Sequence, residues 1–126
     1  GLPVRPVIDA GRGEVATALF RGPLDAWRKL EDERVRTVDD MVASVSEPTL
    51  LCGEGVPSRC SQLVEALGDR AVPVDGYTPA TRLWSLGAIA RYRLDRGDSD
   101  DPDTLQPMYL RRPSIGRPRD PRRIQH

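Results

Sequence analysis

The chain has 126 residues, of which 38% are hydrophobic, and this length and composition fit one domain with a buried core. No run of about 20 apolar residues could span a bilayer, and the first residues lack the charged and then apolar regions of a signal peptide. We therefore expect a cytoplasmic protein without membrane contact. Cys52 and Cys60 are too few for a disulfide framework, and their spacing matches no zinc signature, so we expect reduced structural thiols.

Charge is unevenly distributed along the chain, although the formal net charge is zero. Residues 111–126, RRPSIGRPRDPRRIQH, hold six arginines and one aspartate, so the remainder is mildly acidic. A segment rich in proline and arginine buries too little apolar surface to offset the entropy of ordering it. We predict one domain over residues 1–113 and a flexible basic tail over residues 114–126.

The first part of the chain has the alternation of strands. Residues 4–10 and 14–20 are rich in valine, isoleucine and leucine, and GRG at residues 11–13 separates them. This pattern predicts an antiparallel hairpin with a glycine turn. Residues 26–36 alternate more weakly and are open to two interpretations, a third strand or a short helix, of which we favour the strand.

Helix signals and strand signals then alternate. Thr37 followed by an acidic residue three positions later predicts a short capped helix over residues 37–45. Residues 48–55 predict a strand that ends in glycines, residues 57–69 a helix, and residues 70–74 a short strand. The apolar positions of the second helix are Leu63, Val64 and Leu67.

The longest helix is predicted for residues 77–97, with Thr78 as its cap, Pro79 in its first turn and Gly97 at its end. An apolar stripe along this helix is expected to pack on the sheet. The stripe consists of Leu83, Leu86, Ala90 and Leu94. An extended segment follows, and we expect it to pack through Met108, Tyr109 and Leu110. The fold class is α/β, a mixed sheet with an antiparallel hairpin start and flanking helices.

Four motifs occur in an order that resembles a known family. They are IDAGRGEV (8–15), LLCGEG (50–55), TPATRLWSLGAIA (78–90) and DPDTLQPMYLRRP (101–113). Over residues 7–113 the chain resembles the C-terminal lobe of the TsaB family, bacterial proteins of tRNA threonylcarbamoyladenosine biosynthesis. The resemblance implies a ribonuclease H-like lobe of the actin and Hsp70 type of two-lobed ATPase. Family members are usually about twice this length, so the chain corresponds to the second lobe alone.

The resemblance also implies a vestigial nucleotide cleft. In such ATPases a turn like DAGRG contacts a phosphate through its backbone N–H groups, and a glycine pair after a later strand lets the adenosine approach. The corresponding residues here are Asp9, Gly11, Gly13, Gly53 and Gly55. The alternative is structural, with glycines that permit a hairpin turn and a close entry into a helix. We favour the structural interpretation.

Catalytic chemistry is not expected. The family has been labelled an M22 glycoprotease, but the only histidine is His126, which excludes a histidine metal pair and a serine–histidine arrangement. We predict no catalytic residue, no metal site and no cofactor. A cluster of aspartates lacks the spacing and glycine of a calcium loop, so we interpret it as a solvated turn. Its members are Asp98, Asp100, Asp101 and Asp103.

The resemblance implies a scaffold and activator lobe that works with a TsaD-like catalytic paralogue and a TsaE-like ATPase. That complex installs threonylcarbamoyl on a tRNA adenosine next to the anticodon, so tRNA contact would be indirect. Two alternatives stay open, a degenerate nucleotide-binding module and a basic-tailed domain that contacts RNA phosphates. A homodimer is also possible, because a lone lobe exposes apolar surface. The candidate interaction residues are Arg111, Arg112, Arg117 and Arg119.

Overall fold

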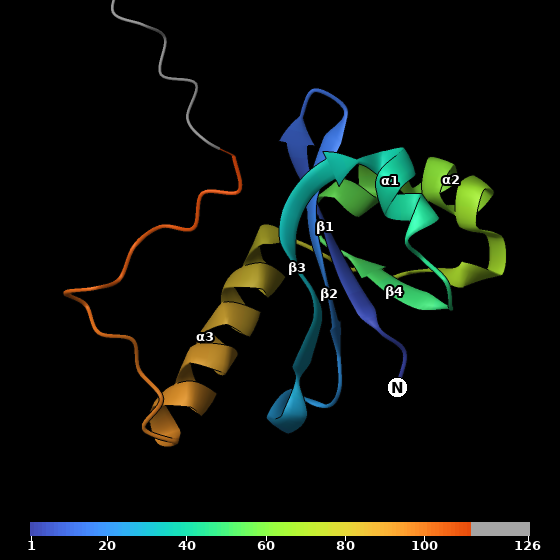
Figure 1. The fold of residues 1–126 in the computed structure, drawn as a ribbon. Helices are drawn as coiled ribbons and strands as arrows, with labels where there is room; N and C mark the ends of the chain where they lie inside the picture. Colours follow the sequence, from blue (N-terminus) through green and yellow to red (C-terminus); the bar gives the residue numbers. More distant parts are fainter. Residues whose placement is uncertain (112–126) are drawn as a thin grey trace, which may run out of the picture.

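The computed structural model describes residues 1–111, so the predicted tail at 114–126 lies outside the described residues. Figure 1 shows a central sheet with α1 and α2 on one side and α3 on the other. The strands are β1 (Val4–Gly11), β2 (Glu14–Arg21), β3 (Arg28–Thr37), β4 (Thr49–Cys52) and β5 (Ala71–Pro73). The helices are α1 (Val38–Ala43), α2 (Gly55–Leu67) and α3 (Pro79–Asp95), and short 3-10 turns lie at Leu24–Ala26 and Gly68–Arg70.

The sheet is mixed, with the strand order β3-β2-β1-β4-β5. β1, β2 and β3 pair antiparallel, whereas β4 pairs parallel to β1 and to β5. The α/β class, the hairpin start and the flanking helices are therefore confirmed. The third strand, for which a short helix was the alternative, is β3.

The GRG sequence forms the tight turn between β1 and β2. Gly11 is paired with Glu14, which leaves Arg12 and Gly13 as a two-residue loop with φ angles of 57° and 75°. Positive φ at both positions is the signature of a type I′ turn, whose twist matches that of a hairpin. The prediction of a glycine turn is confirmed, although arginine is an unusual residue at the first of these positions.

One face of the sheet packs against α1 and α2 to form the core. Successive side chains of a strand point to opposite faces of the sheet, so every second residue of β1, β2 and β4 points toward α1 and α2. The buried cluster consists of Val7, Val15, Val38, Met41, Val45, Leu51, Val56, Leu63 and Leu67. Val64 was expected among them but is 44% exposed, because it lies one position round the helix from Leu63 and faces solvent.

Both predicted N-terminal helix caps, Thr37 and Thr78, are confirmed. The Thr37 hydroxyl accepts a hydrogen bond from the Asp40 N–H at 3.1 Å, which begins α1. Thr78 and Thr81 form a reciprocal capping box at the start of α3, with distances of 3.1 and 2.8 Å. α2 begins two residues earlier than predicted, at Gly55, since Pro57 is tolerated in the first turn of a helix.

The predicted packing of α3 is wrong. Leu83 and Leu86, which were expected to contact the sheet, are 72% and 64% exposed, and no residue of α3 is buried. The helix instead turns Ile89 and Tyr92 toward the sheet, about a third of a turn away from the predicted stripe. Periodicity had identified a real apolar face, but the face points away from the body of the protein.

The segment after α3 is also less packed than predicted. Met108, Tyr109 and Leu110, which were expected to anchor it, are 69%, 72% and 38% exposed. Ion pairs tie the described part of this segment at its two ends instead, from Arg93 to Asp98 and from Arg111 to Glu14. Polar contacts therefore position residues 98–111, and their apolar side chains face solvent.

Candidate functional site

The candidate glycines form two groups at the same end of the sheet. Gly53 and Gly55 follow β4, whose last residue Cys52 pairs with Pro6 in the middle of β1, and Gly11 and Gly13 lie at the hairpin turn, farther along β1. A Cβ atom on Gly53 would lie 2.7 Å from the Val7 carbonyl oxygen, and one on Gly55 would lie 2.9 Å from it. Gly53 also has a φ of 106°, which L side chains rarely adopt. Both glycines are therefore required where α2 starts close against the backbone of β1.

Asp9 lies beside this edge with both carboxylate oxygens engaged. Oδ1 accepts a hydrogen bond from the Gly11 N–H at 2.7 Å, and Oδ2 accepts one from the Arg59 guanidinium at 3.1 Å. The Gly11 N–H, followed by Arg59, lowers the pKa of Asp9, so the carboxylate is ionised at neutral pH. The Asp9–Arg59 ion pair joins the β1–β2 hairpin to α2.

Arg59 is a site residue that sequence reasoning missed. It comes from the second turn of α2, and 50 residues separate it from Asp9. The sequence did contain a hint. When two strands are parallel, the helix that follows one of them starts at the sheet edge toward which the other strand also runs. Without the strand order, that relation could not be assigned to Asp9.

A polar hollow of about 320 Å³ lies beside the hairpin turn. It is bounded by the turn, the start of α1 and one side of α2. Its lining residues are Gly13, Thr37, Val38, Asp39, Arg59 and Gln62. Arg59 is already paired with Asp9, and Asp39 adds a second negative charge, so the balance of charge does not favour an anion here.

The arginine candidates divide between the described residues and the rest of the chain. Arg111 forms an ion pair with Glu14 at the base of the hairpin turn, so the fold uses it to hold the segment after α3. Arg112, Arg117 and Arg119 lie outside the described residues.

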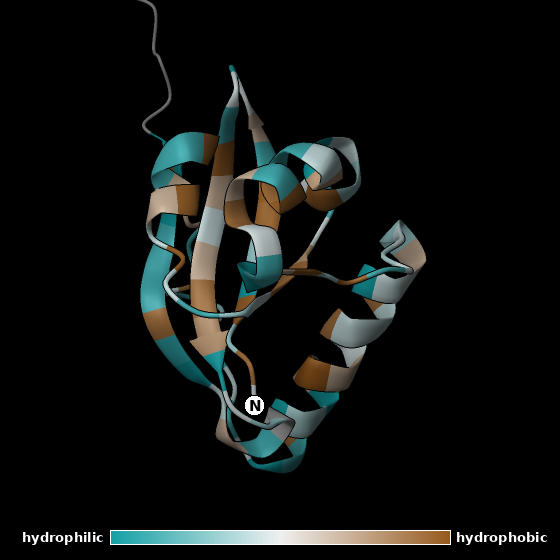
Figure 2. Cartoon of the chain, turned by 90° about the vertical axis from the view of Figure 1, so that its right-hand side faces the viewer, coloured by the Kyte–Doolittle hydropathy of each residue, from teal (hydrophilic) through white to brown (hydrophobic). Residues whose placement is uncertain are grey.

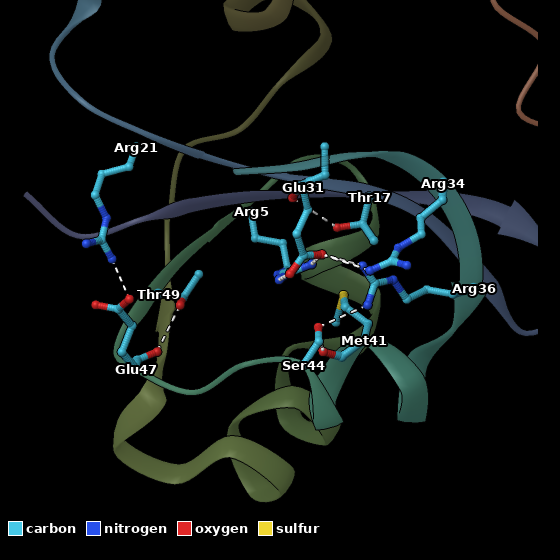
Figure 3. Close-up of polar contacts among 11 residues, drawn as sticks. Arg5, Thr17, Arg21, Glu31, Arg34, Arg36, Met41, Ser44, Glu47 and Thr49 are labelled. Carbon is cyan, nitrogen blue, oxygen red and sulfur yellow. Dashed lines mark hydrogen bonds and ion pairs between the residues drawn. The ribbon is translucent and has the colours of Figure 1, made fainter. Parts of the chain in front are cut away.

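A polar network that the sequence analysis did not foresee lies on the core face of the sheet (Figure 3). Arg5 is only 1% exposed and donates to both oxygens of Glu31, at 2.9 and 3.2 Å. Arg36 also donates to Glu31, and it contacts the Ser44 hydroxyl at 3.0 Å. The Arg5 hydrogen bonds, helped by Arg36, lower the pKa of Glu31 to about 2. This network ties β1 to β3 and to the end of α1.

The other face of the sheet and α3 enclose an apolar hollow of about 610 Å³. Phe20 and Trp27 meet edge to face there, with their ring centroids 6.0 Å apart. The hollow is also lined by Val4, Pro6, Asp25, Ala26, Cys52, Ile89, Tyr92, Arg93 and Asp98. Burial raises the pKa of the Cys52 thiol, so this cysteine is protonated at neutral pH and chemically quiet.

Comparison with known proteins yields no family assignment. No protein-family model matches the chain, and no curated protein matches it.

Two further properties concern the described residues only. Residues 1–111 contain no group of three or more histidine, cysteine, aspartate or glutamate side chains that could hold a metal ion. Asp98 and Asp100 of the aspartate cluster pair with Arg93 instead. In the same part of the chain, every helix is too short or too polar to cross a membrane.

Proposed function

We propose that the chain is a non-catalytic lobe that acts as a scaffold and activator in a TsaB-like role. Its partners would be a TsaD-like catalytic paralogue and a TsaE-like ATPase, and the product would be threonylcarbamoyl on a tRNA adenosine next to the anticodon. The observation that carries the proposal is that the Asp9 carboxylate is fully hydrogen-bonded within the chain. Its two oxygens are both bound within the chain, by Gly11 and Arg59, so the candidate turn serves the fold.

The architecture agrees with a ribonuclease H-like lobe. A hairpin of antiparallel strands starts the sheet, and two parallel strands linked by helices extend it, as the resemblance implies for such a lobe. A nucleotide at the turn would have to compete with the Asp9 carboxylate for Arg59, and Gly53 and Gly55 have the backbone of β1 against them. Function through protein surfaces is therefore favoured over nucleotide binding.

Association with the paralogue tests the proposal directly. We would mix the chain with the TsaD-like and TsaE-like proteins of the same genome and measure complex formation by light scattering after size-exclusion chromatography. The amount of modified adenosine in tRNA would be measured by mass spectrometry with and without the chain. We expect a complex and an increase in product, and we expect Asp9→Asn to retain both.

Two results would overturn the proposal. One is the absence of both a complex and any change in product. The other is binding of ATP by the chain alone in calorimetry, abolished by Asp9→Asn, which would favour the nucleotide-binding module. Thr37→Ala is a matched control for the ATP experiment, because Thr37 lines the same polar hollow and caps α1 without touching Asp9.

A further inference from the structure

The hollow between the sheet and α3 has the size of a small-molecule pocket. Its volume is about 610 Å³, and such pockets usually span about 300–1,000 Å³. Apolar side chains of the sheet and of α3 line it on two sides, and Figure 2 shows hydrophobic bands on the strands and on this helix. Protein interiors leave few voids larger than a water molecule, so a space of this size and lining indicates room for a ligand.

Aromatic rings give the hollow a preference for a flat apolar group. Phe20 and Trp27 meet edge to face with their centroids 6.0 Å apart, and Tyr92 of α3 also lines the space. Trp27 and Ile89 are 44% and 45% exposed although both line the hollow. An aromatic occupant would cover part of this apolar surface and would gain ring contacts beyond the area that it buries.

The charged residues of the lining select the sign of the ligand. They are Asp25, Arg93 and Asp98. Arg93 is already paired with Asp98 at 2.8 Å and with Asp100 at 3.4 Å, so it has little attraction left for an anion. No ion pair within residues 1–111 includes Asp25, and the lining therefore carries a net negative charge. An anion would be repelled here, and a cation would be attracted.

We propose that the hollow binds a small aromatic amine, with its ring among Phe20, Trp27 and Tyr92 and its ammonium group at the Asp25 carboxylate. The rings and the carboxylate attract the same charge, because a cation is also drawn to the face of an aromatic ring. A small molecule suits the site, since the sheet and α3 bound the hollow on two sides. This inference does not depend on the proposed function.

The fluorescence of Trp27 reports on the hollow directly. The chain has two tryptophans, and Trp84 is 81% exposed, so a Trp84→Phe background leaves Trp27 as the only one. The full chain in this background is titrated with phenethylamine and with a neutral and an anionic counterpart, phenethyl alcohol and hydrocinnamate. We expect a saturable change with the amine, at least tenfold weaker binding of the alcohol, and no binding of the carboxylate.

Two carboxylate variants test the role of the charge. Asp25→Asn should weaken binding of the amine at least tenfold and leave binding of the alcohol unchanged, because a hydrogen bond between charged groups is lost while the rings remain. Asp103→Asn is the matched control, since Asp103 is exposed and does not line the hollow, and it should change neither affinity. Equal effects of the two variants, or equal affinities for the amine and the alcohol, would overturn the proposal.

Two lysine variants test the location of the site. Ile89→Lys brings a positive charge into the hollow and should abolish binding of the amine. Leu86→Lys places the same charge at a position of α3 that is 64% exposed and does not line the hollow, so it should leave binding unchanged. Circular dichroism melting verifies that all variants are folded, and equal binding by the two lysine variants would overturn the proposal.

A chain that ends at Arg111 tests whether residues 112–126 occupy the hollow instead of a ligand. We expect it to bind the amine with the same affinity as the full chain. Binding by the shorter chain alone would overturn the proposal, as would the absence of a saturable fluorescence change when the amine is added to the full chain.

Discussion

The helices α2 and α3 show that a strong helix signal and strong packing are separate properties. α3 begins with a complete capping box, whereas the first residue before α2, Glu54, makes no side-chain cap hydrogen bond. Yet α2 buries Leu63 and Leu67 in the core, and α3 buries no residue at all. Local sequence decides where each helix starts and ends, but only tertiary contacts decide which one supports the fold.

The same difference holds for the charged groups of the two regions. In the sheet, Arg5 and Glu31 are joined over 26 positions of sequence, and Arg5 is almost completely buried. Around α3, Arg93 pairs with Asp98 only five positions away, and both side chains are exposed. Buried long-range contacts thus stabilise residues 3–73. Residues 79–111 are held by local contacts and by exposed ion pairs, of which Arg82–Glu54 and Arg111–Glu14 reach the rest of the chain. We infer that the second region is available to a partner at little cost to stability.

The largest effect is expected from breaking one ion pair in each region. Glu31→Gln leaves the buried Arg5 guanidinium without its counter-charge, and losing one partner of a buried pair costs about 3–5 kcal/mol. Asp98→Asn removes a pair between two solvent-exposed side chains, so we expect a much smaller loss in the free energy of unfolding. Urea unfolding at pH 7, followed by circular dichroism, measures both. Equal losses in the free energy of unfolding for the two variants would contradict the difference between the buried pair of the sheet and the exposed pair near α3.

The pH dependence of the Glu31 variant sharpens this prediction. The pKa of Glu31 is about 2 in the folded chain, below the ordinary value of 4.5, so its ionised form stabilises the fold. That contribution is complete above about pH 4.5 and is lost as the pH falls through about 2. The gap in unfolding free energy between wild type and Glu31→Gln should therefore narrow over this window. A gap that stays constant would mean that Glu31 acts through shape and not through charge.

The next effect compares one leucine of each helix. Leu63 is fully buried, and truncating such a residue costs about 2–5 kcal/mol. Leu86 is 64% exposed, so Leu86→Ala should change the unfolding free energy of the monomer by no more than about 0.5 kcal/mol. A large loss for Leu86→Ala would show that the stripe packs on the body after all.

A smaller effect compares two glycines with positive φ. Gly53→Ala combines a φ of 106° with a contact of 2.7 Å to the Val7 carbonyl oxygen, and we expect a loss of about 3 kcal/mol. Gly97, after α3, has a φ of 72° and open space around it, so Gly97→Ala should lose about 1 kcal/mol. Thermal melting of the two variants gives the ratio. Similar losses would mean that the close packing at Gly53 relaxes freely.

Sequence patterns were sufficient for the elements and for the turn. Alternation identified β1 and β2, glycines identified the hairpin, and hydroxyl caps at Thr37 and Thr78 identified two helix starts. These signals act within a few residues, so they survive in any tertiary context. The strand order and the side of α3 that is turned toward the sheet depend on contacts between distant segments. Periodicity alone could not reveal that Leu83 and Leu86 are exposed.

The candidate site was predictable only in part, for the same physical reason. The motif around Asp9 indicated a turn, and Gly55 could be identified as the position of a close entry into a helix. The side chains that pair with the charged residues could not be predicted, since Arg59 contacts Asp9 across 50 positions of the sequence and Arg5 contacts Glu31 across 26. Alternation does place Arg5 on the same strand face as Val7, which was the available hint that an arginine would be buried.

Amide hydrogen exchange, resolved by peptide and measured on the full chain, tests the contrast between the two regions most directly. We expect α2 amides to exchange only through global unfolding, and α3 amides to exchange much faster through local opening. Protection of α3 equal to that of α2 would contradict the division of the fold into a stable body and a helix that buries none of its residues.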